Sequence, residues 1–444
     1  MKTPLLSTAI IMVSFVVGLQ ARAQDPATKA WTLDEFVKKS VESSQTVEVK
    51  KLTYEQNDAA VDEKSSAFLP TVNATASSYK SGNENGIADT GQNITSSSLN
   101  QAYTQTKVNF SANLFNGLQD SLNLKAAKHQ RTGAQLNWAD ARYTQVANSI
   151  EAYFTVLQYE SDLKNQQKEI EINEQSLKET QRKLRYGGAR KTEVISLQST
   201  IATNKINMVA TQSSLNQERL TALRLINLGD EPLQLKYEPG RCGAENIQSI
   251  IARMDPKKRA DYKALGATTD AADATLSATK GKKFPTVDFT TSYVLSDSQA
   301  ISQQGSYNMA LTLTIPFPFG FESRAQVAQA TKSLAIAKMN QEKSLLDLQQ
   351  SRDGLIRQLL DDLANIKVLA EAKILNEQNV KAMKEDHRSG ISTYSDVLSA
   401  STTYQQTIRQ YDKAVLQLDL DCYRALVWSA DENQLLESFK GESI

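Results

Sequence analysis

The sequence predicts an α+β membrane protein in which each chain contributes four transmembrane β-strands and long coiled-coil α-helical hairpins. Three observations lead to this fold class. The chain is internally duplicated, and each half contains two alternating stretches of strand length followed by a very long segment of helical periodicity. In both halves the helical segment is interrupted at a glycine, Gly187 and Gly390. The pattern resumes at the same distance from each glycine, at Val194 and Val397.

The first residues have the pattern of a secretory signal peptide. Lys2 precedes an apolar run, and the small residues Ala21 and Ala23 are typical of a cleavage site, so residues 1–23 are expected to be removed. The apolar run is shorter than the roughly 20 residues that a spanning helix needs. Gln24 follows the cleavage site where a lipid anchor would require cysteine, so we expect export without such an anchor.

Composition and motifs argue against several functional classes. Lys plus Arg and Asp plus Glu both number 50, which shows no nucleic-acid footprint. No nucleophile motif, phosphate loop or acid–base cluster appears, so we expect neither an enzyme nor a cofactor. His129 and His387 lack the spacing of a metal site. Cys422 occupies a helical seam position, which favours a buried thiol, and a disulfide to Cys242 is the alternative.

The duplication divides the chain into predicted segments. The first repeat (24–230) contains an initial helix, strands at 71–80 and 103–115, and a helical hairpin at 120–228. A linker (231–250) leads to the second repeat (251–430), with a helix, strands at 286–295 and 307–316, and a hairpin at 321–430. Residues 431–444 form a tail.

The predicted strands alternate between apolar and polar residues. Val108 and Phe110 share one face of their strand, and Phe289 shares the corresponding face in the second repeat. The opposite faces, which we expect to line a wet interior, carry Lys107, Asn109, Asn113 and Asp288. Each stretch has about 10 residues, the length of a tilted strand that crosses an outer membrane. A water-soluble antiparallel sheet with one wet face is the alternative interpretation.

Four strands are too few to close a barrel, because the smallest spanning barrels have about eight. An open sheet edge in lipid would leave backbone hydrogen-bonding groups without partners. If these strands span a membrane, several chains must therefore build one barrel together.

The helical segments have the spacing of coiled coils. Neither 121–186 nor 322–389 contains a proline. Apolar residues recur every seven positions before the first glycine turn and alternate by three and four after it, which indicates left-handed supercoiling. The residues before the turn are Leu163, Ile170, Leu177 and Leu184. Polar residues interrupt the seam after the turn, at Asn204, Thr211 and Glu218, so we expect water nearby.

In this order, these motifs resemble the TolC family of outer-membrane efflux proteins over nearly the whole mature chain. The most specific are Phe68-Leu69-Pro70 and Phe284-Pro285 before strands, Leu114-Phe115-Asn116-Gly117 and Ile315-Pro316-Phe317 before helices, and the duplicated glycine turns. The resemblance implies a homotrimer with a twelve-stranded β-barrel in the outer membrane of a Gram-negative bacterium. It also implies a long α-helical barrel in the periplasm, surrounded by an equatorial belt to which the linker contributes.

The resemblance also implies a function. It is that of a passive exit duct for a tripartite efflux pump or a type I secretion system, set in outer-membrane lipid. An inner-membrane transporter, in contact with the duct only indirectly, would supply the energy. The hairpin tips would close the periplasmic end and dock onto a periplasmic adaptor protein. The tip residues here are Tyr186, Gly187, Gly188, Ser389, Gly390 and Ile391.

The family's periplasmic gate is matched only in part. Asp396 corresponds to the first of two aspartates that form an acidic ring, while Ser399 stands in place of the second. Ser392 stands in place of the family's latch arginine. We therefore expect other partners to close the gate, with Arg190 or Lys191 pairing with Glu193 or Asp396. A solvated hairpin tip with no gating role is the alternative.

Two functions from other classes remain open at this point. One is a periplasmic coiled-coil scaffold or adaptor without a membrane barrel. The duplication and the four similar strands argue against it, and fractionation would distinguish the two. The other is a secreted degradative enzyme, which the absence of a clustered catalytic set makes remote.

Overall fold

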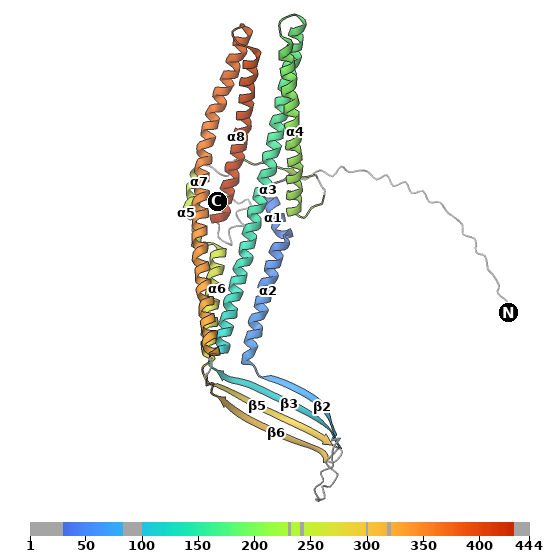
Figure 1. Ribbon diagram of the computed structural model, residues 1–444, viewed down its shortest axis with the longest axis vertical. Coiled ribbons are helices and arrows are strands. Elements are labelled where there is room, and N and C mark those ends of the chain that lie inside the picture. Colours follow the sequence, from blue (N-terminus) through green and yellow to red (C-terminus); the bar gives the residue numbers. More distant parts are fainter. Residues whose placement is uncertain are drawn as a thin grey trace, which may run out of the picture.

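The computed structural model describes residues 30–82, 100–229, 232–239, 244–298, 301–317 and 321–429. It consists of two long helical hairpins that lead at one end into a single β-sheet (Figure 1). The predicted signal peptide, most of the spacer between the first two strands, Cys242 and the predicted tail lie outside the described residues.

The sheet contains the four predicted strands, in an entirely antiparallel arrangement of order β2-β3-β5-β6 (Figure 1). Their bounds are Thr71–Gly82 for β2, Asn100–Asn116 for β3, Thr286–Ser298 for β5 and Ile301–Thr314 for β6. Strand β6 begins earlier than its predicted residue 307. Residues 302–306 are polar or glycine and show no alternation, but their backbone continues the ladder with β5. Pairing between strands therefore extends β6 beyond what its own sequence indicates.

The two hairpins are built from a long and a shorter helix each. The first consists of α3 (Gln119–Arg185) and α4 (Lys191–Leu225), and the second of α7 (Glu322–Arg388) and α8 (Tyr394–Ser429). Both α3 and α7 have 67 residues, which corresponds to a length of about 100 Å. Among the described residues, no helix is both long enough and apolar enough to cross a membrane.

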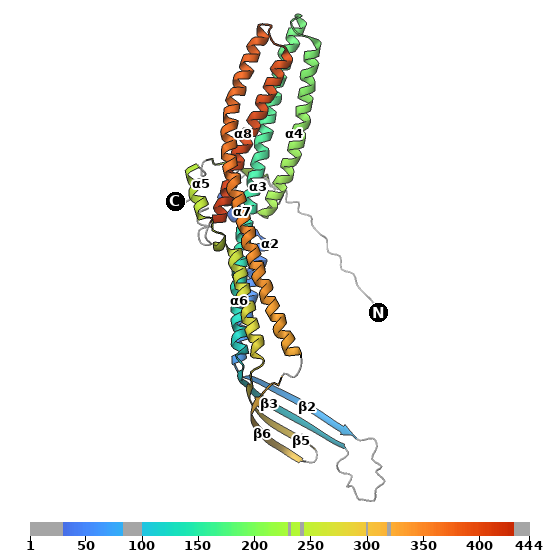
Figure 2. The ribbon, with the colours of Figure 1, turned by 60° about the vertical axis from the view of Figure 1, so that its left-hand side comes forward.

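Two further helices accompany the halves of α3 and α7 nearest the sheet. These are α2 (Gln45–Ser65) and α6 (Ala260–Gly281), which place four helices in the packing order α2-α3-α6-α7 (Figure 1). Figure 2 shows α6 beside α7. Farther from the sheet, α4 and α8 replace α2 and α6 as the neighbours of α3. The helical part of one chain is therefore a single layer, four helices wide at each level.

The seam between α3 and α4 follows the predicted spacing. Leu197, Ile201 and Leu215 are buried along it. The polar interruptions are paired directly across the seam: Gln166 Nε2 donates to Thr211 Oγ1 (2.9 Å), and Asn204 Nδ2 donates to Glu169 Oε1 (3.0 Å). Two of the three predicted polar interruptions, Asn204 and Thr211, thus find a partner on the facing helix.

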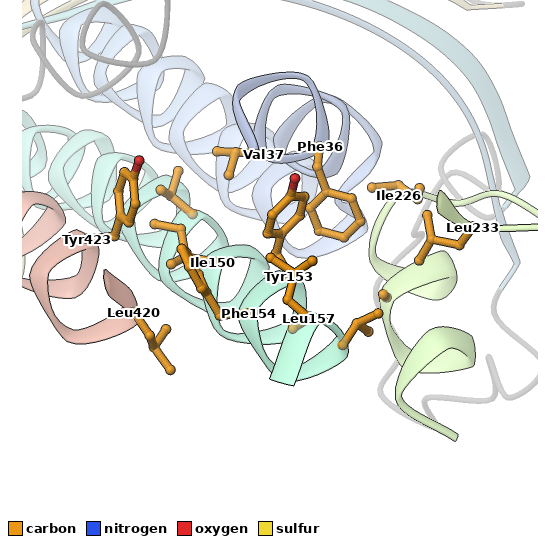
Figure 3. Close-up of a cluster of buried hydrophobic side chains, with 14 of the residues drawn as sticks. Phe36, Val37, Ile150, Tyr153, Phe154, Leu157, Ile226, Leu233, Leu420 and Tyr423 are labelled. Carbon is orange, nitrogen blue, oxygen red and sulfur yellow. The ribbon is translucent and has the colours of Figure 1, made fainter. Parts of the chain in front are cut away.

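The largest hydrophobic core surrounds the middle of α3 (Figure 3). Side chains of α1 (Leu33–Ser43), α4 and α8 converge there on Tyr153, whose ring meets Phe36 edge-on at 5.5 Å. The Tyr153 hydroxyl lies 3.0 Å from the carbonyl oxygen of Trp31 and 2.6 Å from that of Lys236. Trp31 is the last residue of β1 (Ala30–Trp31), and Lys236 directly follows β4 (Gln234–Leu235). The two short strands pair in parallel. The Tyr153 side chain thereby ties both β1 and the end of β4 to α3.

A second core joins α7 and α8 to α5 (Ala244–Arg253) and contains Leu359, Ile247 and Cys422. Short 3₁₀ turns at Ser66–Phe68 and Pro256–Lys258 complete the described elements. Cys422 is fully buried, as predicted, but it is disulfide-bonded, so the preference for a free thiol was wrong. The only other cysteine in the sequence, Cys242, lies outside the described residues. The preference for a thiol came from the seam position of Cys422, and burial does not distinguish a thiol from a disulfide.

The passage from strand to helix depends on Gly117. This residue has φ +67°, and a Cβ added to it would lie 2.8 Å from the Cβ of Phe284 and closer still to the carbonyl oxygen of Gly281. Both the left-handed backbone and the close approach of the second repeat therefore require glycine here.

Replacing Gly117 with alanine should lower the free energy of unfolding by on the order of 3 kcal/mol, from backbone strain and steric overlap together. Urea denaturation followed by helical circular dichroism measures it. Gly354→Ala in α7 is the matched control, because nothing lies within 4 Å of an added Cβ there. It should be neutral or stabilise by up to about 1 kcal/mol. Equal effects of the two changes would contradict the assignment.

Candidate functional site

The two hairpin tips farthest from the sheet share one backbone motif. Gly187 and Gly390 adopt φ +75° and φ +77°. In each tip the next residue donates to a carbonyl five positions back: Gly188 N to Lys183 O, and Ile391 N to Asp386 O, both at 2.8 Å. This is a Schellman cap, which satisfies the last carbonyls of a helix and reverses the chain. The duplicated glycines are therefore helix terminators, and they leave Tyr186 and Ile391 largely exposed.

Asp396 caps the second helix of its hairpin. Its carboxylate accepts from the backbone N–H (2.9 Å) and the hydroxyl (2.7 Å) of Thr393, and these bonds lower the pKa of Asp396. Its own N–H lies 3.3 Å from Thr393 Oγ1, which completes a capping box. The pattern Thr393-x-x-Asp396 is visible in the sequence. The sequence analysis assigned Asp396 only to a gate, although one carboxylate both caps α8 and remains exposed at the tip.

Ser392 and Ser399, the two positions that depart from the family's gate, lie on the same tip. Ser392 Oγ donates to the carbonyl oxygen of Met383 (3.2 Å), and Ser392 O lies 3.2 Å from His387 Nδ1. Ser392 therefore closes its own hairpin turn. Ser399 is exposed one helical turn after Asp396, and its side chain adds no charge there.

Arg190 and Glu193 lie at the first tip. Arg190 is the residue that precedes α4, and the backbone N–H of Glu193 donates to its carbonyl oxygen (3.1 Å). Among the described residues of a single chain, Arg190 and Lys191 form no ion pair with Glu193 or Asp396. A gate built from these charges would therefore have to form between chains, so their pairing stays a prediction.

A contact that the sequence analysis missed joins the two hairpins near their tips. Tyr394, in the first turn of α8, places its hydroxyl close to the side chains of Ser176 and Thr180 on α3, which favour its ionised form. The ring is half-buried, and burial raises the pKa of its hydroxyl. His387 packs edge-on against the same ring, with centroids 5.7 Å apart. Tyr394 thus ties the second tip to the first hairpin.

Further polar contacts continue between α3 and α8 toward the core. Asn165 Nδ2 donates to Asp412 Oδ2 (2.7 Å), and Gln158 Nε2 donates to Gln417 Oε1 (3.1 Å). Nearer the tips, Arg409 lies 3.3 Å from the carboxylate of Glu169, which is only 4% exposed. The two hairpins are therefore joined by directional bonds, whereas an apolar surface would allow them to slide.

A carboxyl pair lies where α7 and α8 meet the second core. Asp421 is fully buried and accepts from Gln358 (2.9 Å), Gln417 (2.7 Å) and Arg424 (2.9 Å). Asp362 lies beside it. Burial, followed by the charge of Asp421, raises the pKa of Asp362 to about 6. The pair therefore holds a proton under mildly acidic conditions.

The proton on Asp362 makes folding stability depend on pH. Its pKa rises from 3.8 in the unfolded chain to about 6 in the folded protein. The folded state therefore binds the proton more tightly, and stability should fall as the pH rises from about 4 to about 6. Urea midpoints measured at intervals over this range should show a weaker pH dependence for Asp362→Asn than for wild type. Asp347→Asn, an exposed carboxylate on the same helix, is the control. Identical profiles for wild type and Asp362→Asn would contradict the assignment.

The sheet has one polar and one apolar face. Lys107, Asn109 and Asn113 share a face with Asp288, and Asn113 Nδ2 donates to Asp288 Oδ1 at 2.8 Å. On the other face Phe110 and Phe289 meet with ring centroids 6.2 Å apart. That face continues into β6, where apolar side chains are strongly exposed: Tyr307 80%, Met309 65%, Leu311 67% and Leu313 61%. An apolar surface of this extent on a folded chain marks contact with lipid or with protein.

The described residues include no group of three or more side chains suited to hold a metal ion. His129 instead lies 4.0 Å from Asp270, in a pair on the helical surface.

Several solved structures share this fold. The outer membrane protein VceC of Vibrio cholerae matches with a TM-score of 0.76 and 14% identity, over 89% of this chain and 95% of that one. The CmeC outer membrane channel of Campylobacter jejuni matches with 0.77 and 12%, over 99% and 98%. The open state of the MtrE outer membrane channel of Neisseria gonorrhoeae matches with 0.64 and 18%, over 90% of both. No curated protein sequence matches the chain.

The fold is therefore that of an outer-membrane channel with a periplasmic helical extension. The model of the outer membrane efflux protein family matches residues 37–227 and 257–422, which is more than half of the chain. The chain belongs to this family. The resemblance to TolC-like proteins is confirmed, and with it the location in the Gram-negative outer membrane, from which the helices extend into the periplasm.

Proposed function

We propose that three copies of this chain assemble into one passive exit duct, closed at the hairpin tips until an adaptor opens it. The observation that carries the proposal is that the sheet is incomplete. Strands β2 and β6 each pair on one side only within the described sheet. Backbone groups at a sheet edge cannot stay unpaired in lipid. Family membership supports an efflux duct and disfavours the periplasmic scaffold.

Three four-stranded sheets joined edge to edge would close a barrel of twelve strands. The polar face would then surround a water-filled interior, and the apolar face would contact lipid. Lys107, Asn109, Asn113 and Asp288 would line the interior. The faces of the sheet thus match the two environments that a barrel requires.

The helical layer is incomplete in the same way. Its outer helices expose apolar side chains at their free sides, including Val49 (59%) and Leu52 (53%) on α2, and Ile336 (62%) and Met339 (63%) on α7. In a trimer, α2 of one chain would meet α7 of the next. Burying such side chains stabilises an assembly by about 25 cal/mol per Å² of apolar surface.

The tips supply the gate and the docking surface in this proposal. The exposed turns at Tyr186–Gly188 and Ser389–Ile391 would meet a periplasmic adaptor, and Asp396 would place three carboxylates around the narrow end of the duct. The sequence has no nucleotide-binding motif, so an inner-membrane transporter would power export. Both a tripartite efflux pump and a type I secretion system have this arrangement.

Single-channel recording of the detergent-purified mature protein in planar bilayers tests the duct, and its mass in detergent tests the trimer. Wild type should insert as a trimer with small, stable openings. Asp396→Ala should conduct more or change its ion preference, because three carboxylates leave the constriction. If Asp396→Ala conducts with the same size and ion preference as wild type, closure of the duct does not depend on Asp396. Folded protein that never inserts would refute the duct.

Tyr394→Phe should loosen the tips. The change removes the hydroxyl that lies close to Ser176 and Thr180 of the other hairpin, a loss on the order of 1 kcal/mol per chain. We expect larger conductance in bilayers and greater sensitivity to bulky antibiotics in cells. Tyr404→Phe is the control, since the charged groups near its hydroxyl, Glu377 and Lys381, belong to its own hairpin. If both variants behave as wild type, Tyr394 has no part in closure.

A further inference from the structure

A cavity of the described chain lies in the helical layer near the sheet. It has a volume of about 690 Å³ and is lined by residues from all four helices of that layer. A hollow that touches four consecutive helices lies on the concave side of the layer. Closing such layers into a ring turns their concave sides toward a common interior.

The periodicity of α3 supports this orientation. Gln130 and Asn137 line the cavity, and Thr144, seven residues farther along, lines the next cavity on the same side of the helix. Tyr153 follows Thr144 by about two and a half turns at 3.6 residues per turn, and so faces the opposite side. The core that contains α1 packs there, around Tyr153. The side of α3 that carries Gln130 and Asn137 is thus opposite to the side that carries Tyr153.

The charges in this cavity are all positive. Its lining includes Lys50 on α2 and Lys282 at the end of α6, and it includes no carboxylate. The other lining side chains are hydroxyls, amides and small residues. Lys282 Nζ lies 3.3 Å from the amide oxygen of Gln326, which leaves the ammonium charge uncompensated.

The neighbouring acidic side chains do not line the cavity themselves, although Asp140 and Glu322 interact with residues that do. Asp58 binds Arg131 at 3.1 Å, and Asp140, which senses the charge of Lys50, lies 3.6 Å from Arg259. The carboxylate of Glu322 accepts a hydrogen bond from Gln326 Nε2 (3.0 Å). The whole chain has as many acidic as basic residues. The excess of positive charge in this cavity therefore comes from the positions of the two lysines and not from the overall composition.

We propose that this segment of the duct selects for anions, through Lys50 and Lys282, and that the exported substrates carry negative charge. The inference rests on the proposed trimeric duct. Three chains would direct six ammonium groups into one water-filled volume. A passage lined by one sign of charge concentrates ions of the opposite sign, and the effect reaches about 8 Å at physiological ionic strength. The hydroxyls and amides around the lysines would keep the passage hydrated.

Reversal potentials under a KCl gradient in planar bilayers test the proposal. The test compares wild type, the double variant Lys50→Gln/Lys282→Gln and the control Lys51→Gln/Lys280→Gln. The control removes the same charge from neighbouring positions that do not line the cavity, and Lys51 is there paired with Glu48 at 3.4 Å. Each protein is also measured with the additional substitution Tyr394→Phe, which should loosen the tips. The ion selectivity of the interior is then not hidden by a closed constriction.

We expect the chloride-to-potassium permeability ratio to fall at least about twofold in the double variant, and to stay near the wild-type value in the control. Equal ratios for the double variant and the control, in channels that conduct, would overturn the role of the lysines and leave the duct intact. Folded protein of trimeric mass that never conducts would refute the duct itself, and the selectivity inference with it.

Discussion

The arrangement of this protein depends on how the middle of α3 is held. A helix of 67 residues has no fixed position of its own, and its two ends serve different environments. Around Tyr153, side chains of α1, α4 and α8 bury a common core. The Tyr153 hydroxyl donates to the carbonyl oxygens of Trp31 and Lys236. This packing fixes which side of α3 faces outward.

Beyond that core the hairpins are held by polar contacts more than by apolar ones. Glu169 is almost fully buried and is shared by Asn204 of its own hairpin and Arg409 of the other. Burying such groups contributes little net stability, but leaving any one of them unpaired is costly. A shift of one hairpin against the other would break several of these bonds at once. The polar seam therefore specifies register, which a purely apolar seam would leave open.

At the membrane end the chain shows the opposite condition, an intact ladder with two open edges. Three strand pairings leave β2 and β6 with one free side each, and the apolar face is largely uncovered. The outer helices repeat this pattern with exposed side chains such as Leu52 and Met339. Sheet and helices thus lack neighbours on the same two sides, so one symmetric association would satisfy both. This common incompleteness is the physical reason why the trimer proposal accounts for so much of the chain.

The sequence by itself determined the four strands, their polar and apolar faces, the two hairpins and the glycine turns, because each depends on local period or on backbone conformation. Gly187 and Gly390 are recognisable without knowing what surrounds them. Only the tertiary structure decided that Tyr394 lies close to Ser176 and Thr180, that Asp362 lies beside Asp421, and that Lys50 and Lys282 share a cavity. These pairs come from helices far apart in the chain, and no periodicity encodes which side chains of two packed helices meet. The charges that would gate and line a duct are therefore set by packing, on a framework that the sequence pattern already reveals.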